Sequence, residues 1–277
     1  MAEWQKGVTM PRNMDITEHN RQAWNAESAA GSEWATPVDD ETITQARAGD
    51  WSVVLTPRRA VPREWFGDLS GKEVLCLGSG GGQQAPVLAA AGARVTSYDL
   101  SENQLAKDQL VAEAHELPVT CVRGDMTHLS AFREAQFDLI FHPVSNLFVP
   151  DVEPVWKECG RVIKPNGILL AGFMNPSFFL FDHEEATASG ELTVRYSLPY
   201  SEPASLEGEA RGVWEKSGRP AEFSHSLESQ FGGQLAAGFG LTALYEDHWD
   251  DDATPFNRYS HTSIATRSVA GMLDRSS

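Results

Sequence analysis

A short apolar segment that leads directly into a run of glycines constrains the fold of this chain more than any other feature. Residues 73–77 read Glu-Val-Leu-Cys-Leu, and residues 78–82 read Gly-Ser-Gly-Gly-Gly. Glycine permits a tight turn and lets the backbone approach a ligand that a Cβ atom would exclude. The pattern therefore predicts a strand that turns into a helix over 84–91, with a ligand at the N-terminal amides of that helix.

An aspartate at the end of the next apolar run indicates the kind of ligand. Residues 94–98 form that run, and Asp99 stands about 20 residues after Gly78, which is the span of one β-α-β unit. A carboxylate at the tip of the neighbouring strand lies within reach of ribose hydroxyls. We therefore expect a site for a cofactor that carries a ribose. The alternative is an ordinary α/β domain in which the glycine-rich loop and the surface aspartate bind no ligand.

The glycine spacing separates two classes of cofactor. The dinucleotide pattern G-x-G-x-x-G, taken from Gly78, requires a glycine where the chain has Gln83. A frame from Gly80 to Ala85 delays the turn by two residues after the apolar strand. The frame that fits is Gly78-x-Gly80-x-Gly82, which resembles the first motif of class I S-adenosylmethionine-dependent methyltransferases.

Four further segments occur in the order that this family shows. They are a helix over 101–115, a strand over 119–123, a strand over 137–142, and the turn 161–167 before the apolar run 168–173. The resemblance implies a Rossmann-like, doubly wound α/β fold. We expect a mostly parallel seven-stranded sheet with an antiparallel last strand, an N-terminal helical segment and a cap insertion.

The resemblance also implies S-adenosyl-L-methionine as the cofactor and assigns residues to it. Asp99 would bind the ribose diol, and Asp125, just past the third strand, would face the adenine amine. From the N-terminal segment, Trp51 and Thr56 are candidates to line the pocket. Further cofactor contacts are expected at Gly78, Ser79, Gly80, Gly82, Gln84, Leu100, Gln104, Gly124, Met126 and His142.

The acceptor side of the reaction is expected at the end of the fourth strand. His142 and Asn146 should lie near the methyl group and are the candidate catalytic residues, since Pro143 fixes the backbone beside them. The alternative for His142 is a histidine that hydrogen-bonds to the backbone beneath the site. His225, at the start of a helix over 227–237, is a further candidate whose alternative role is to cap that helix.

Changes in composition and sequence pattern divide the chain into three parts. Residues 1–66 contain four of its tryptophans after position 20 and should form a helical segment over the cofactor site. Residues 67–174 and 225–277 should form the methyltransferase core. Residues 175–224, with an expected strand over 192–198, should form a substrate cap above the carboxyl ends of the strands.

Composition limits the substrate class and the cellular location that we expect for this protein. The formal charge of −17 disfavours a nucleic-acid substrate. No apolar run reaches the length of a membrane span, and residues 1–14 lack the apolar segment of a signal peptide, so we expect a cytoplasmic protein. Its three cysteines are expected to be reduced thiols, and no metal site is expected. The partner is expected to be a small-molecule substrate, and the protein a monomer or homodimer.

Three functional classes stay open. A small-molecule methyltransferase leads. An NAD(P)-dependent oxidoreductase on a related sheet is opposed by Gln83 and by the turn 164–167. A non-catalytic cofactor-binding protein is the third, because many methyltransferases of this class carry an acidic residue where this chain has Cys76, and because no base is assured.

Overall fold

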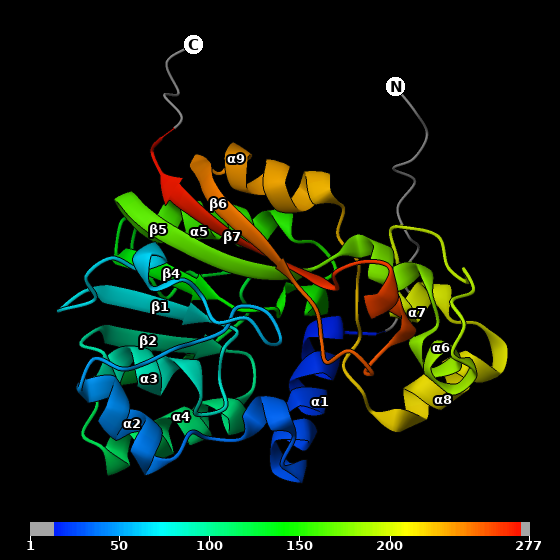
Figure 1. Cartoon of the computed structure of the whole chain (residues 1–277), viewed down its shortest axis with the longest axis horizontal. Helices are drawn as coiled ribbons and strands as arrows, with labels where there is room; N and C mark the ends of the chain where they lie inside the picture. Colours follow the sequence, from blue (N-terminus) through cyan, green and yellow to red (C-terminus); the bar gives the residue numbers. More distant parts are fainter. Residues whose placement is uncertain (1–13, 273–277) are drawn as a thin grey trace.

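A seven-stranded sheet forms the centre of the computed structural model, which describes residues 14–272 (Figure 1). Its strands are β1 (Glu73–Leu77), β2 (Arg94–Asp99), β3 (Val119–Arg123), β4 (Phe137–His142), β5 (Ile163–Met174), β6 (Phe239–Asp247) and β7 (Ser263–Ala270). They lie in the order β3-β2-β1-β4-β5-β7-β6, and β7 is antiparallel to both of its neighbours. The pairs from β3 to β5 are parallel. The predicted Rossmann-like sheet is therefore confirmed.

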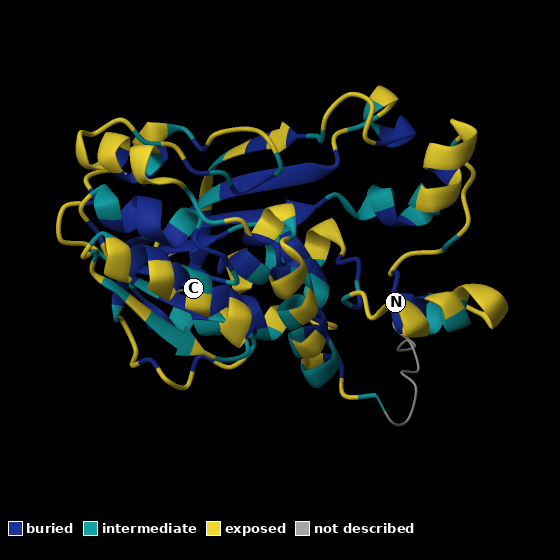
Figure 2. Ribbon diagram, turned by 90° about the horizontal axis from the view of Figure 1, so that it is seen from below, coloured by how far each residue is buried: buried dark blue, intermediate teal, exposed yellow. Residues whose placement is uncertain are grey.

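Helices cover both faces of the sheet, so its central strands β1 and β4 are largely buried (Figure 2). Successive residues of β1 point into different cores: Cys76 packs against α3 (Gln84–Ala90), and Leu77 lies in the core that α5 (Glu153–Val162) closes. The near-continuous apolar sequence of such strands follows from this two-sided burial. Two further helices pack nearby: α2 (Asp40–Arg47) packs on α3, and α4 (Glu102–Ala114) packs along β2 and β3.

The N-terminal helix α1 (Ile16–Ala30) lies between the core and the cap (Figure 1). It begins at Asp15, whose carboxylate accepts a hydrogen bond from the Glu18 N–H, and it ends at Gly31 in the left-handed conformation. Ile16 joins a small core with Trp214 and Phe223 of the cap. The two segments expected to cover the site therefore pack on each other.

The cap follows β5 and lies at the carboxyl ends of the parallel strands (Figure 1). It contains the 3-10 turn Pro176–Leu180, α6 (His183–Ser189), α7 (Glu202–Ser205) and α8 (Gly208–Ser217). The strand expected over 192–198 is wrong. In the described chain an isolated bridge joins Val194 to Phe181, and the Val194 side chain is exposed, so no neighbour extends the pairing.

The remaining elements complete the description. The π-helical turn Glu228–Gly232 runs into α9 (Gly233–Ala236), and short 3-10 turns span Glu33–Ala35, Arg63–Trp65, Asn146–Phe148 and Pro255–Arg258. Cys76, Cys121 and Cys159 are free thiols. Among residues 14–272, no helix combines the length and the apolar character needed to cross a bilayer.

Candidate functional site

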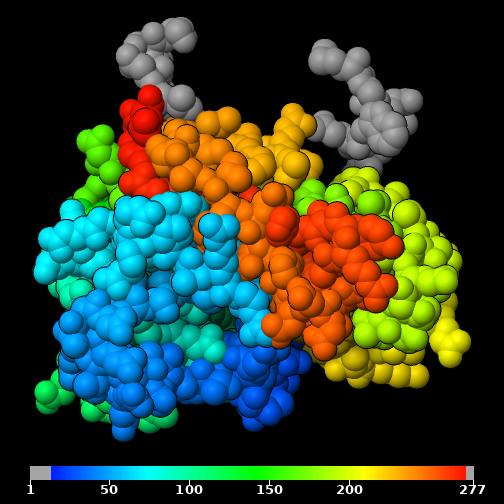
Figure 3. Space-filling model, viewed as in Figure 1, coloured from blue at the N-terminus to red at the C-terminus, as the bar shows by residue number. Residues whose placement is uncertain are grey.

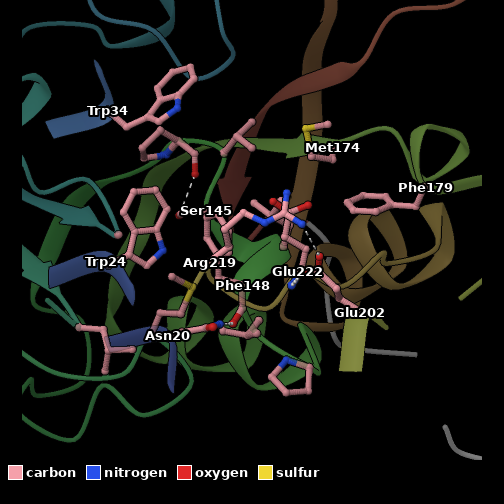
Figure 4. Close-up of a pocket in the computed structure, with 18 of the residues that line it drawn as sticks. Asn20, Trp24, Trp34, Ser145, Phe148, Met174, Phe179, Glu202, Arg219 and Glu222 are labelled. Atoms are coloured by element: carbon pink, nitrogen blue, oxygen red, sulfur yellow. Dashed lines mark hydrogen bonds and ion pairs between the residues drawn. The ribbon is translucent and has the colours of Figure 1, made fainter. Parts of the chain in front are cut away.

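A cavity of about 970 Å³ lies at the carboxyl ends of the strands, between the glycine loop and the cap. Its volume is that of a site for a cofactor and a small ligand together. Figure 4 draws residues that line it, with Trp24 and Trp34 from the N-terminal segment on one side and Met174 and Phe179 on the other. The segment that joins β6 to β7 lies against the cap (Figure 3), where Trp249 and Phe256 contact the Phe178 ring.

The glycine loop meets the cavity at Gly78, Ser79 and Gly80. Gly80 is required by its neighbours inside the protein, because a Cβ there would lie 2.6 Å from the Gln104 Cβ and 3.2 Å from Asp99 Oδ2. Gly82 is not among the residues that line the cavity, and its N–H donates to the buried carboxylate of Asp108 (2.7 Å).

Asp99 lines the cavity at the end of β2, as its position predicted. Its Oδ2 accepts a hydrogen bond from the Gly80 N–H (3.1 Å), and its Oδ1 accepts one from the Ser101 N–H (2.9 Å). Burial raises the pKa of this carboxyl, and the two backbone donors oppose the shift. Each oxygen keeps a lone pair that could accept a further hydrogen bond from a ligand.

Two polar atoms beside Asp99 have no partner within residues 14–272. They are the hydroxyl of Ser79 and the side-chain oxygen Oε1 of Gln104, both buried in residues that line the cavity. A buried polar atom without a hydrogen bond costs free energy, about 1–3 kcal/mol. These atoms are therefore suited to hydrogen bonds with a polar ligand. Gln84 and Leu100 also line this part of the cavity.

Asp125 connects the cavity to the N-terminal helix. Its Oδ1 accepts hydrogen bonds from the N–H and the hydroxyl of Thr127 (2.8 Å each), and its Oδ2 accepts one from the Thr17 hydroxyl (3.3 Å). Gly124 and Met126 line the cavity on either side. Gly124 must be a glycine, because a Cβ would overlap the hydroxyl of Tyr98.

The N-terminal residues that line the cavity are only partly those expected. Thr56 lines the cavity and donates to Asp247 Oδ2 (2.8 Å). Trp51 does not line it, because its ring packs edge-on against Phe66 (5.0 Å) and is covered by the Arg63 guanidinium (3.5 Å). One face of α1 reaches the cavity instead, through Thr17, Asn20 and Trp24. The spacing of three and four residues is a helical signal that could have identified this face.

The structure places His142 outside the residues that line the cavity. As the last residue of β4 it points toward the α5 face of the sheet, where its ring meets Trp156 edge-on (5.8 Å). The side chain is fully buried, and Nδ1 donates to the Leu77 carbonyl (2.9 Å). Burial lowers the pKa of this imidazole to about 4. This position matches the alternative role, a histidine that hydrogen-bonds to the backbone beneath the site.

Asn146 is likewise not among the residues that line the cavity. Its side-chain amide exchanges two hydrogen bonds with the amide of Gln230 (3.2 Å each), and its carbonyl accepts from His225 Nε2 (3.0 Å). His225 therefore holds the loop after β4 and does not line the cavity either. The residues of this loop that reach the cavity are Pro143, Val144, Ser145, Leu147, Phe148, Val149, Pro150 and Asp151.

The cap end of the cavity combines aromatic and acidic side chains. Tyr200 and Phe179 stack (5.6 Å between ring centroids) in a cluster with Leu147 and Met174. Beside them lie Glu202 and Glu222. Burial, together with the charge of Glu222, raises the pKa of Glu202 to about 7, and burial raises that of Glu222 to about 7. Sequence reasoning missed both carboxyls.

These raised pKa values predict how stability depends on pH. A carboxyl whose pKa is higher in the folded than in the unfolded state favours folding at low pH, and that contribution is lost as pH rises through the folded value. Between about pH 6.5 and about pH 8.5 the pair should lower the free energy of unfolding by roughly 1 kcal/mol. Urea unfolding at both pH values should show this loss in the native protein and a smaller one in a Glu202→Gln, Glu222→Gln double variant. Burial also raises the pKa of Asp108 to about 7, but Asp108 is present in both proteins and contributes equally to each. Equal pH dependence in both proteins would therefore contradict the raised pKa values of Glu202 and Glu222.

Comparisons with known proteins agree with this arrangement. A family model described as a methyltransferase domain matches residues 75–171. The chain is 46% identical over 254 residues to an uncharacterized methyltransferase, YbaJ, of Bacillus subtilis, covering 92% of this chain and 98% of that protein. It is 33% identical to a ubiquinone biosynthesis O-methyltransferase of Bordetella bronchiseptica over 54% of this chain and 64% of that protein. The fold is similar to a crystal structure of an S-adenosylmethionine-dependent methyltransferase from Mesorhizobium loti, with a TM-score of 0.56, 20% identity, and coverage of 75% of this chain and 94% of that one.

Proposed function

Because the chain belongs to the class I S-adenosylmethionine-dependent methyltransferases, we propose that it methylates a small molecule enclosed between the glycine loop and the cap. The observation that carries this proposal is the continuity of one cavity from Gly78 to the cap residue Glu222. Cofactor and acceptor can then meet at the loop that follows β4. An oxidoreductase is no longer supported, because the family is shown to be a methyltransferase.

The side chains on the glycine-loop side fit the cofactor. We expect Asp99 to accept hydrogen bonds from the ribose diol, and the unpartnered atoms of Ser79 and Gln104 to bond with other polar groups. Asp125 is expected to accept from the adenine amine. When bound, S-adenosylmethionine supplies a methyl group that is already electrophilic. The protein then has to position the acceptor and exclude water.

A small acceptor is favoured over a macromolecule for two reasons. The net charge of −17 repels a phosphate backbone. The cavity is covered by α1 and the cap, so an acceptor must fit within about 970 Å³ shared with the cofactor. The Bordetella bronchiseptica relative is named a ubiquinone biosynthesis O-methyltransferase, and the match spans less than two thirds of that protein.

Calorimetric titration tests the proposal directly. The pure protein should bind S-adenosylmethionine and S-adenosylhomocysteine in the micromolar range, and NAD should give no measurable heat. Binding of NAD in preference to S-adenosylmethionine, or absence of binding by both adenosyl ligands, would overturn the cofactor assignment.

Hydrogen exchange should report whether the N-terminal segment and the cap close on the ligand. Thr17 reaches Asp125, and Gln83 Nε2 donates to the carbonyls of Glu33 and Thr36, so these segments are linked to the cofactor side. S-adenosylhomocysteine should slow exchange in residues 17–36 and 175–224 as well as 78–84. Residues 263–270 serve as the internal control. Protection confined to 78–84 would show that neither segment acts as a lid.

A further inference from the structure

Carboxyl groups are concentrated at the cap end of the cavity. The acidic residues that line it there are Asp151, Asp182, Glu184, Glu202, Glu209 and Glu222. Among the described lining residues, Arg219 is the one lysine or arginine, and burial lowers the pKa of the neighbouring His183. Acidic groups therefore outnumber basic ones at this end of the cavity, and above about pH 7, where Glu202 and Glu222 are ionised, the field there attracts cations and repels anions.

Glu202 and Glu222 are held together by the backbone. The Glu202 N–H donates to the Glu222 carbonyl (2.9 Å), and the Glu222 N–H donates to Glu202 Oε2 (3.1 Å). Arg219 divides its charge between Glu184 (2.9 Å) and Glu202 (3.7 Å). No hydrogen bond from residues 14–272 reaches the Glu222 carboxylate. Figure 4 shows Glu202, Arg219 and Glu222 together at the cavity.

This acidic pair lies beside the loop that follows β4. The Phe223 N–H donates to the Leu147 carbonyl (2.8 Å). Asn20 joins the same two segments, because its Nδ2 donates to the carbonyls of Phe148 (2.8 Å) and Ala221 (3.1 Å). Since β4 pairs with β1, which ends at the glycine loop, the acidic pair of the cap lies beside a loop that adjoins the cofactor side.

Aromatic rings complete the surroundings of the pair. Tyr200 stacks on Phe179 and lies 5.0 Å from the Tyr196 ring. It is 9% exposed, lines the cavity, and its hydroxyl makes no hydrogen bond within the described chain. Aromatic faces attract a desolvated cation, and a free hydroxyl can accept from an N–H donor. The rings and carboxylates together are complementary to an ammonium group on an apolar body.

From this arrangement, and resting on the proposed methyltransferase function, we infer that the methyl acceptor is a primary or secondary amine bound by Glu202 and Glu222. The amine binds as an ammonium ion and loses a proton to a carboxylate or to water. Its nitrogen lone pair then forms the bond to the methyl carbon, while the electrons of the carbon–sulfur bond pass to sulfur. Positive charge thus moves from sulfur to nitrogen, and a further proton can leave the product nitrogen.

The direction of this charge movement explains why carboxylates suit an amine acceptor. Anionic groups beside the nitrogen stabilise the positive charge that develops there in the transition state. A phenolate or carboxylate acceptor would instead bring a negative charge into a negative field. The acidic pair therefore discriminates among acceptors by charge.

Binding of three probes of similar shape tests the inference. The probes are phenethylamine, 2-phenylethanol and phenylacetate, titrated at about pH 8 into protein saturated with S-adenosylhomocysteine. We expect the amine to bind at least tenfold more tightly than the alcohol, and phenylacetate more weakly than either. Glu222→Gln should weaken amine binding about tenfold and leave alcohol binding within twofold. Glu207→Gln, outside the cavity, should change neither.

The outcomes separate this inference from the function on which it rests. Absence of S-adenosylhomocysteine binding in the preceding titration would contradict the methyltransferase site. With that binding intact, an amine that fails to bind, or binds no better than the alcohol, would overturn the amine assignment. Unchanged amine affinity in Glu222→Gln would do the same.

Discussion

Asp99→Asn is expected to weaken S-adenosylmethionine binding by about a hundredfold, because charge-assisted hydrogen bonds to the ribose diol are each worth about 1.5–3 kcal/mol. The substitution keeps the shape of the side chain and one oxygen that can accept from Gly80 or Ser101. The fold should therefore persist. Calorimetric titration with S-adenosylmethionine measures the loss, and the far-ultraviolet spectrum checks that the variant is folded.

Asp138→Asn is the matched control for this variant. Asp138 is the second residue of β4 and, like Asp99, accepts a backbone N–H, that of Glu73 (2.9 Å), but it lies at the amino end of its strand and does not line the cavity. Native affinity in Asp138→Asn with a large loss in Asp99→Asn would locate the effect at the cofactor. Native affinity in both variants would remove Asp99 from the site.

The parts of the site that the sequence predicted depend on local pattern. A strand, its glycine turn and the aspartate at the next strand end are separated by one β-α-β unit, so their meeting at one sheet edge follows from the fold class. Gly78, Asp99 and Asp125 accordingly line the cavity. His142 does not line the cavity, because its position at the end of a strand does not decide which face of the sheet its side chain joins. The strand pleat carries Phe141 to one core and His142 to the other face.

The parts that could not be predicted depend on contacts between distant segments. Glu202 and Glu222 meet because Ser201 forms an isolated bridge with Phe223, and neither residue lies in a strand that the sequence marks. The burial that raises their pKa values comes from the fold of the cap. Trp24 and Trp51 are the same residue type, but Trp24 lies on the face of α1 that lines the cavity, whereas Trp51 lies outside any helix and packs against Phe66.

Gly80→Val is expected to abolish cofactor binding and also to destabilise the protein. Any Cβ at this position meets the Gln104 Cβ at 2.6 Å, so the first turn of α4 must move, and Asp99 Oδ2 at 3.2 Å must move with it. Overpacking of this kind costs about 1–3 kcal/mol. The Gly80 N–H now donates to Asp99, so a shifted loop also misplaces the carboxylate expected to hold the ribose.

Two measurements distinguish the effects of Gly80→Val. Urea unfolding should show the loss of stability, and titration of the folded variant should show S-adenosylmethionine affinity reduced more than a hundredfold, since loop and carboxylate are displaced together. Gly212→Val on α8 is the control, because a Cβ there meets no atom within 4 Å and the glycine is not in the left-handed region. It should keep native affinity. If Gly80→Val keeps both native stability and native affinity, the close approach of α4 to the glycine loop does not govern the cofactor site.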